Sequence, residues 1–140
     1  MLTAVITVTG AASISTTPIA YGQITEETVK AEKVAISDTE SIVREYFKDI
    51  PVMVQVARCE STFRHDLSDG SVLQGKVDPA DTGVMQINKR YHEAAAIKLG
   101  LDLENIHDNM AYARFLYENQ GTQPWSASRP CWGNTVAYSG

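Results

Sequence analysis

The fold is decided by the sequence PVMVQVARCES, which runs from Pro51 to Ser61. Proline suits the first turn of a helix, and the residues after it are apolar on most sides, so this segment predicts a helix at the centre of the domain. Glu60 lies in the last turn of that helix. A carboxylate there faces the negative end of the helix dipole, and apolar neighbours add to the cost of its charge. We therefore expect Glu60 to have a raised pKa and to be usable as a general acid.

A second helix is expected in front of this segment. Ser37-x-x-Glu40 has the form of a capping box and predicts the start of an amphipathic helix that ends before Pro51. Residues 23–36 are charged and weakly patterned, which indicates a linker or a solvated helical lead-in. The folded domain is then expected over residues 37–140.

The segment 64–82 has a different composition. Its Gly, Asp and Pro residues are typical of turns, and short β-capable pieces occur at Val72-Leu73 and Lys76-Val77. We expect a small hairpin or irregular β-like lobe here. Helices are predicted again from about Asn88 to Leu99, and from about Asp108, as the cap, to about Asn119, with Gly121 as the stop. The sequence thus predicts a predominantly α-helical α+β fold with the lobe directly after the Glu60 helix.

Composition limits the classes of function. At 140 residues there is room for one domain with a real core. The net charge is −5 and there is no basic cluster, which argues against a nucleic-acid partner. The three histidines, His65, His92 and His107, lack the spacing of metal ligands. We expect no metal and no cofactor, and a monomer.

Residues 1–22 carry no charged side chain and are rich in Ala, Thr, Val and Ile. Ala20 and Gly22 provide small residues two apart, as a signal-peptidase site requires. Gly10 and Pro18 interrupt the apolar run, so no stable membrane span is expected. The segment is interpreted as a secretory signal, with a disordered N-terminus or an uncleaved anchor as the alternatives. The protein is then expected to be secreted or extracytoplasmic, at the cell envelope.

Two cysteines, Cys59 and Cys131, stand far apart in the sequence. They are either two buried free thiols or, as we expect for an exported chain, one disulfide. Such a bridge would stabilise the fold by roughly 4 kcal/mol in the chain-entropy model. It would also tie the C-terminal segment to the residue beside Glu60, which favours a functional site there.

Three motifs occur together in this chain: ARCESTFR at 57–64, GVMQI at 83–87 and NMAYARFLY at 109–117. In this order they resemble the lysozyme-like domain of soluble lytic transglycosylases, over about residues 50–132. A Cys-Glu pair with a late Cys beside Trp is also similar to the compact domain of resuscitation-promoting factors, a related group. The resemblance implies a lysozyme-like fold.

The resemblance also implies an activity, namely cleavage of the β-1,4 bond between N-acetylmuramic acid and N-acetylglucosamine in peptidoglycan glycan strands. Glu60 would be the acid and then the base, with formation of a 1,6-anhydro ring. Gln86 would line the saccharide groove, and Ser61 would support the end of the glutamate's helix. Tyr112 is a candidate saccharide contact, with core packing as the alternative. The Ala-Tyr-Asn motif of the family is absent after the third match, so the role of its tyrosine is unassigned, and Trp125 is our candidate for stacking on a sugar face.

Two alternative functions stay open. Asp66, Asp69, Asp78 and Asp81 are typical turn residues, but one of them at 6.5–9.5 Å from Glu60 would activate a water and make the enzyme a muramidase, a hydrolysing lysozyme. The other alternative is a wall-binding or secretion-associated module without turnover, against which the intact Glu60 argues.

Overall fold

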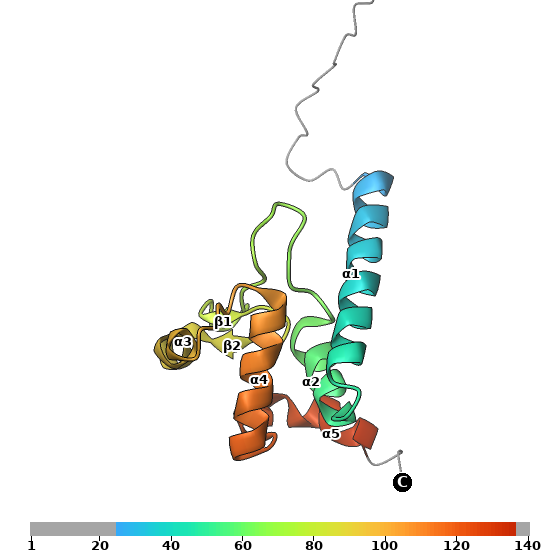
Figure 1. Cartoon of the computed structure of the whole chain (residues 1–140). Helices are drawn as coiled ribbons and strands as arrows, with labels where there is room; N and C mark the ends of the chain where they lie inside the picture. Colours follow the sequence, from blue (N-terminus) through green and yellow to red (C-terminus); the bar gives the residue numbers. More distant parts are fainter. Residues whose placement is uncertain (1–24, 137–140) are drawn as a thin grey trace, which may run out of the picture.

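The computed structural model describes residues 25–136. Helices dominate this part of the chain, and one small antiparallel sheet accompanies them, which confirms the predicted α+β class (Figure 1). The predicted signal segment at 1–22 lies outside the described residues, as do residues 137–140.

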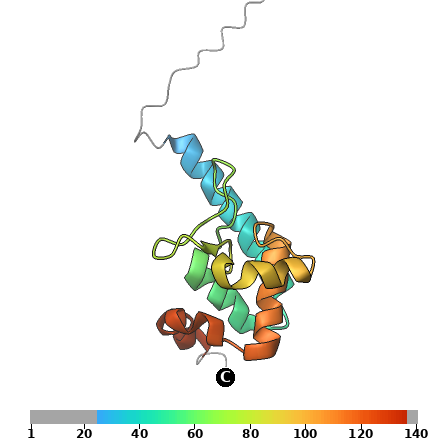
Figure 2. The same ribbon diagram turned by 90° about the vertical axis from the view of Figure 1, so that its left-hand side faces the viewer.

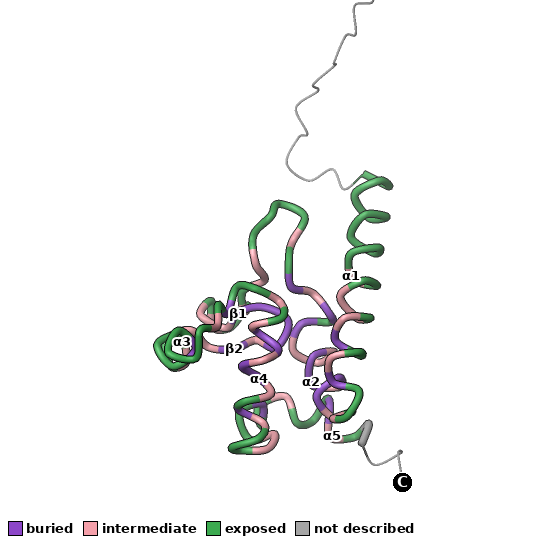
Figure 3. The backbone as a smooth tube through the Cα atoms, viewed as in Figure 1, coloured by how far each residue is buried: buried purple, intermediate pink, exposed green. Residues whose placement is uncertain are grey.

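Helix α1 runs from Glu26 to Tyr46 and begins earlier than predicted. Thr25 is its N-cap, accepting a hydrogen bond from the Thr28 amide at 3.3 Å, so the predicted capping box at Ser37 does not start a helix. Residues 26–36 are therefore helical, as in the lead-in alternative. Ala, Glu and Lys in this stretch favour helix, and two glutamates in the first turn complement the helix dipole. This half of α1 is exposed and extends away from the helical body (Figures 2 and 3).

Helix α2 spans Pro51–Ser61 and is buried along much of its length, as predicted. It ends because Thr62 adopts a left-handed conformation, with φ of 52°, and its amide bonds to the Arg58 carbonyl. Phe63 follows with φ of 57°, so the chain turns sharply away just after Glu60. Phe63 is buried, which holds this strained turn against the core.

The segment 64–82 forms an irregular β-like lobe with isolated bridges, which is the second of the two predicted alternatives, and the paired hairpin begins only at its end. Strand β1, Asp81–Thr82, pairs antiparallel with β2, Ile87–Asn88, so GVMQ at 83–86 is its turn. Val72 forms only an isolated bridge with Asp66, and the β-capable pieces at 72–73 and 76–77 form no strand. Tertiary contacts override local propensity here, because the turn is placed by buried polar side chains of other segments, as shown below.

Helix α3 runs from Lys89 to Lys98 with Asn88 as its cap, close to the prediction. Helix α4, Ile106–Gln120, is capped by Asn105 and not by Asp108. The Asn105 side chain accepts from the amides of His107 and Asp108, and Asp108 lies in the first turn, where its charge suits the dipole. Gly121 ends α4 as predicted.

The C-terminal segment folds back onto α2. It forms the 3₁₀-helix η1, Gln123–Ser128, and then α5, Arg129–Val136. The expected disulfide is confirmed: Cys59 of α2 and Cys131 of α5 are bonded at 2.07 Å. Trp125 and Trp132 are both buried in the core, which is filled by apolar side chains from α1, α2, the hairpin turn, α4 and this segment. Among the described helices, none is long and apolar enough to span a bilayer.

Candidate active site

A groove of about 350 Å³ opens at the C-terminal end of α2. Its walls come from the hairpin, the start of α3, the end of α4 and η1. The residues that line it are Glu60, Asp81, Gln86, Ile87, Asn88, Tyr91, His92, Leu116, Gln120, Pro124, Trp125 and Ala127. Larger hollows occur elsewhere on the described surface, but this groove contains a partly buried carboxyl group whose pKa is raised.

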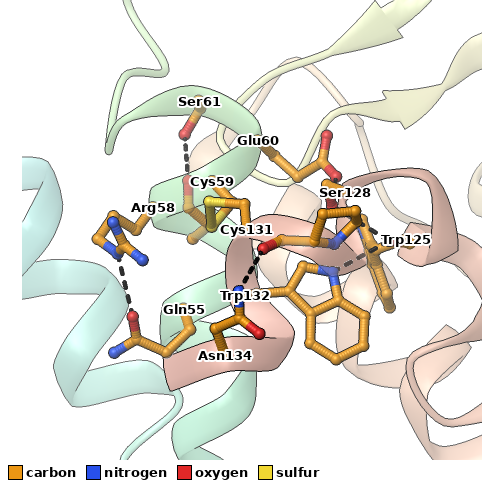
Figure 4. Close-up of a disulfide and its surroundings, with 12 residues drawn as sticks. Gln55, Arg58, Cys59, Glu60, Ser61, Trp125, Ser128, Cys131, Trp132 and Asn134 are labelled. Carbon is orange, nitrogen blue, oxygen red and sulfur yellow. Dashed lines mark hydrogen bonds between the residues drawn. A yellow bond between two sulfur atoms is a disulfide. The ribbon is translucent and has the colours of Figure 1, made fainter. Parts of the chain in front are cut away.

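Glu60 lies in this groove with its carboxyl group partly buried. Burial raises the pKa of this carboxyl, because the charged form loses water. The Ser128 hydroxyl donates a hydrogen bond to Glu60 Oε1, which opposes the rise in pKa (Figure 4). The negative charge of Asp81 adds to the rise. The net effect keeps Glu60 protonated to a higher pH than an exposed glutamate, as a proton donor requires.

The hairpin contributes Gln86 and Asp81 to the lining of the groove. Gln86 has a left-handed backbone, with φ of 50°, and its side-chain amide donates to the Gly83 carbonyl at 2.9 Å. The Asp81 carboxylate accepts from the Asn88 side chain at 2.8 Å, across the strand pair. Both side chains are therefore held in place before any ligand arrives.

Two buried polar residues hold the hairpin turn. His65 Nδ1 accepts from the Val84 amide at 3.0 Å, so Nε2 carries the ring proton and donates to the Glu104 carbonyl at 2.8 Å. Gly83 has φ of 73°, and a Cβ there would lie 2.6 Å from the His65 ring and 2.7 Å from the Asn109 side chain. The turn thus needs glycine both for its conformation and for the close approach of these two side chains.

Three of the predicted site residues lie together, and two lie apart from them. Glu60, Gln86 and Trp125 line the groove, whereas Ser61 and Tyr112 are buried outside it. Ser61 donates to the Ala57 carbonyl at 2.9 Å, within α2. The Tyr112 hydroxyl contacts His92 Nδ1 at 3.1 Å, so its only link to the groove in the described contacts runs through that histidine.

Trp125 lines the groove without presenting its ring to solvent. It is 3% exposed, and its indole N–H donates to the Met85 carbonyl at 2.9 Å. It therefore packs beneath the groove and connects η1 to the hairpin turn. The large aromatic ring that does face solvent beside the groove belongs to Tyr91, which is 75% exposed.

Sequence reasoning missed Ser128 and Tyr91. Ser128 lies three residues before Cys131, and Cys59 immediately precedes Glu60. The expected disulfide could have been used as a distance restraint that brings Ser128 near the acid. Tyr91 gave a weaker signal, namely a large aromatic residue on a helix that is otherwise poor in core positions.

The described residues contain no group of three His, Cys, Asp or Glu side chains that could hold a metal ion. Comparison of the chain with protein-family models, curated proteins and solved structures found no match. What the protein does is therefore inferred from the residues and the geometry of the groove.

Proposed function

We propose that this protein is a peptidoglycan lytic transglycosylase with a lysozyme-like domain. The observation that carries the proposal is Glu60, a partly buried carboxyl group with a raised pKa at the end of the central helix, facing an open groove. A general acid needs this combination of retained proton and access to substrate. The motifs around Glu60, at 83–87 and at 109–117 support the same class of enzyme.

Glu60 would act twice in one turnover. Its proton passes to the glycosidic oxygen as the bond to C1 of the muramyl residue breaks. The resulting carboxylate then takes the proton of the muramyl 6-hydroxyl as that oxygen attacks C1, which closes the 1,6-anhydro ring and restores the acid. No water enters the product, and Glu60 ends the cycle as it began.

The walls of the groove suit a glycan. Gln86 and Gln120 offer amide donors and acceptors for sugar hydroxyl and acetamido groups. Tyr91 provides an exposed aromatic face against which a sugar ring can pack. The Cys59–Cys131 disulfide suits an oxidising compartment, and the proposed substrate lies in the cell envelope.

One observation favours hydrolysis as a second candidate function. Asp81 lines the same groove and acts on Glu60 through its charge. An aspartate on the other side of a bound glycan could activate a water, and the enzyme would then be an inverting muramidase. Of the four aspartates considered from the sequence, Asp81 is the one among the groove-lining residues.

Digestion of purified peptidoglycan followed by mass spectrometry of the products tests both candidates. Anhydro-muramyl ends support the transglycosylase, and reducing muramyl ends support the muramidase. Glu60→Gln should lower the rate by about 10²–10⁴-fold, the usual contribution of a general acid. The matched control is Glu118→Gln on the exposed surface of α4, which should leave the rate unchanged.

Asp81→Asn separates the two candidates in a second way. A transglycosylase should keep most of its turnover, whereas a muramidase that uses Asp81 as base should lose it. Absence of any product from the unmodified protein, or full activity of Glu60→Gln, would contradict the proposed function.

A further inference from the structure

The Ser128 hydroxyl lies between two acceptors. It is bonded to Glu60 Oε1, and it lies 3.1 Å from the carbonyl oxygen of Trp125 (Figure 4). A serine hydroxyl carries one hydrogen, so it can donate to only one of these acceptors at a time. Which acceptor receives the hydrogen must then depend on the state of Glu60.

The second acceptor does not rely on Ser128. The Trp125 carbonyl also accepts from the Trp132 indole N–H at 3.0 Å. When the serine hydrogen turns toward Glu60, this buried carbonyl still has a donor, and no unsatisfied polar group results. A hydrogen bond to an ionised carboxylate is about twice as strong as one between neutral groups, so the charged form of Glu60 attracts the hydroxyl hydrogen most strongly.

The covalent structure holds Ser128 at this place. Ser128 is the last residue of η1, and Cys131 follows in the first turn of α5. Cys131 is bonded to Cys59, the residue that precedes Glu60. The serine and the glutamate are thus tied together through a short covalent path in addition to their hydrogen bond, and Figure 4 shows both on the same side of the bridge.

We propose that Ser128 is the positioning residue of Glu60, its hydroxyl donating to Oε1 when the carboxylate forms and leaving Oε2 to exchange the proton with the substrate. This inference rests on the proposed function only in assigning the proton transfer to Glu60. In the acid form, the Ser128 hydroxyl can donate either to Glu60 or to the Trp125 carbonyl, one at a time. In the carboxylate form it belongs to Glu60, so Ser128 stabilises the state that must take the second proton. Ser128 does not itself gain or lose a proton.

A titration of Glu60 tests the inference without requiring turnover. The full chain is labelled with ¹³C at the glutamate carboxyl carbon, and the Glu60 resonance, assigned by its loss in Glu60→Gln, is followed against pH. Ser128→Ala should raise the pKa of Glu60 by about one pH unit or more, because a donor to the charged form is lost. Ser128→Thr keeps the hydroxyl and should titrate as the unmodified protein does. Ser126→Ala, an exposed serine of the same 3₁₀-helix, is the matched control.

The pH dependence of cleavage gives a second readout. Glu60 must be protonated to start the reaction, so the alkaline limb of kcat/KM should move to higher pH in Ser128→Ala and return in Ser128→Thr. An unchanged Glu60 titration in Ser128→Ala, or a shift of equal size in Ser128→Thr, would overturn the role of Ser128. If the unmodified protein releases no glycan fragments, the proposed function fails, while the titration still decides the inference about Ser128.

Discussion

Replacing Asn109 by alanine should make the hairpin that lines the groove less rigid, although Asn109 is not itself a groove-lining residue. Asn109 is fully buried on α4. Its amide donates to the carbonyls of Thr82 at 3.0 Å and Leu103 at 2.9 Å, and its oxygen accepts from the Met85 amide at 3.0 Å. One side chain therefore connects strand β1, the hairpin turn and the loop in front of α4 to the same helix.

The expected loss of free energy of unfolding follows from the buried backbone groups that lose their hydrogen-bond partner. Asn109→Ala removes three hydrogen bonds at once, and each leaves a buried backbone group whose loss of pairing costs about 1–3 kcal/mol. The lower end of that range gives about 3 kcal/mol. Water can enter the space of the missing amide, and single substitutions rarely exceed 4–5 kcal/mol. We expect the free energy of unfolding to fall by about 3–5 kcal/mol, a large share of the 5–15 kcal/mol typical of a domain.

Urea denaturation followed by circular dichroism measures this loss. Asn119→Ala is the matched control, because Asn119 is an exposed asparagine of the same helix whose side chain bonds only the Phe115 carbonyl one turn away. Its effect should stay within about 0.5 kcal/mol. Glycan cleavage by folded Asn109→Ala should also weaken, since Gln86 loses its fixed position in the groove wall. A loss of stability below about 1 kcal/mol would refute the reasoning that this amide holds the hairpin.

Three further outcomes are expected. Arg114 donates to the Asp49 carboxylate and lowers its pKa from 3.8 to about 2, so this ion pair stabilises the fold above pH 4 and is lost as the pH falls through 2. The melting temperature of Asp49→Asn should therefore lie below that of the unmodified protein at pH 7 and meet it near pH 2, whereas parallel curves would refute this. Reduction of Cys59–Cys131 should lower the free energy of unfolding by about 4 kcal/mol, measured in urea with and without reductant, and an unchanged midpoint would contradict it. Tyr91→Ala should raise the KM for soluble glycan fragments roughly tenfold with kcat nearly unchanged, because a covered ring contributes on the order of 1–2 kcal/mol; an unaltered KM would exclude Tyr91 from the glycan contacts.

Local pattern predicted the elements whose formation depends on nearby residues. The apolar run from Pro51 makes α2 central, and its length places Glu60 at the end of the helix. The approximate start of α3 at Asn88 and the stop of α4 at Gly121 were likewise predicted from local pattern, whereas the predicted cap of α4 at Asp108 was wrong because Asn105 takes that role. Local pattern failed at the start of α1, where favourable helix propensity continued through the expected boundary at Ser37.

Contacts between segments far apart in the sequence could not be predicted from local sequence pattern. The position of the hairpin depends on His65 and Asn109, which lie outside it. His65 accepts a hydrogen bond from the Val84 amide, and Asn109 accepts one from the Met85 amide and donates one to the Thr82 carbonyl. The burial of Trp125 depends on its bond to the Met85 carbonyl, so an aromatic residue suited to a sugar became part of the core.

By itself, then, the sequence determined a central helix that ends in an acid, a disulfide partner for the residue beside that acid, and the class of fold around them. Only the tertiary structure decided what surrounds the carboxyl group of Glu60: the Ser128 hydroxyl on one oxygen, the charge of Asp81 in the same groove, and the exposed ring of Tyr91 among the lining residues. The physical reason is distance along the chain. Helix formation depends on residues a few positions apart, whereas the acidity of a buried carboxyl depends on every charge and donor that folding brings within a few ångströms of it.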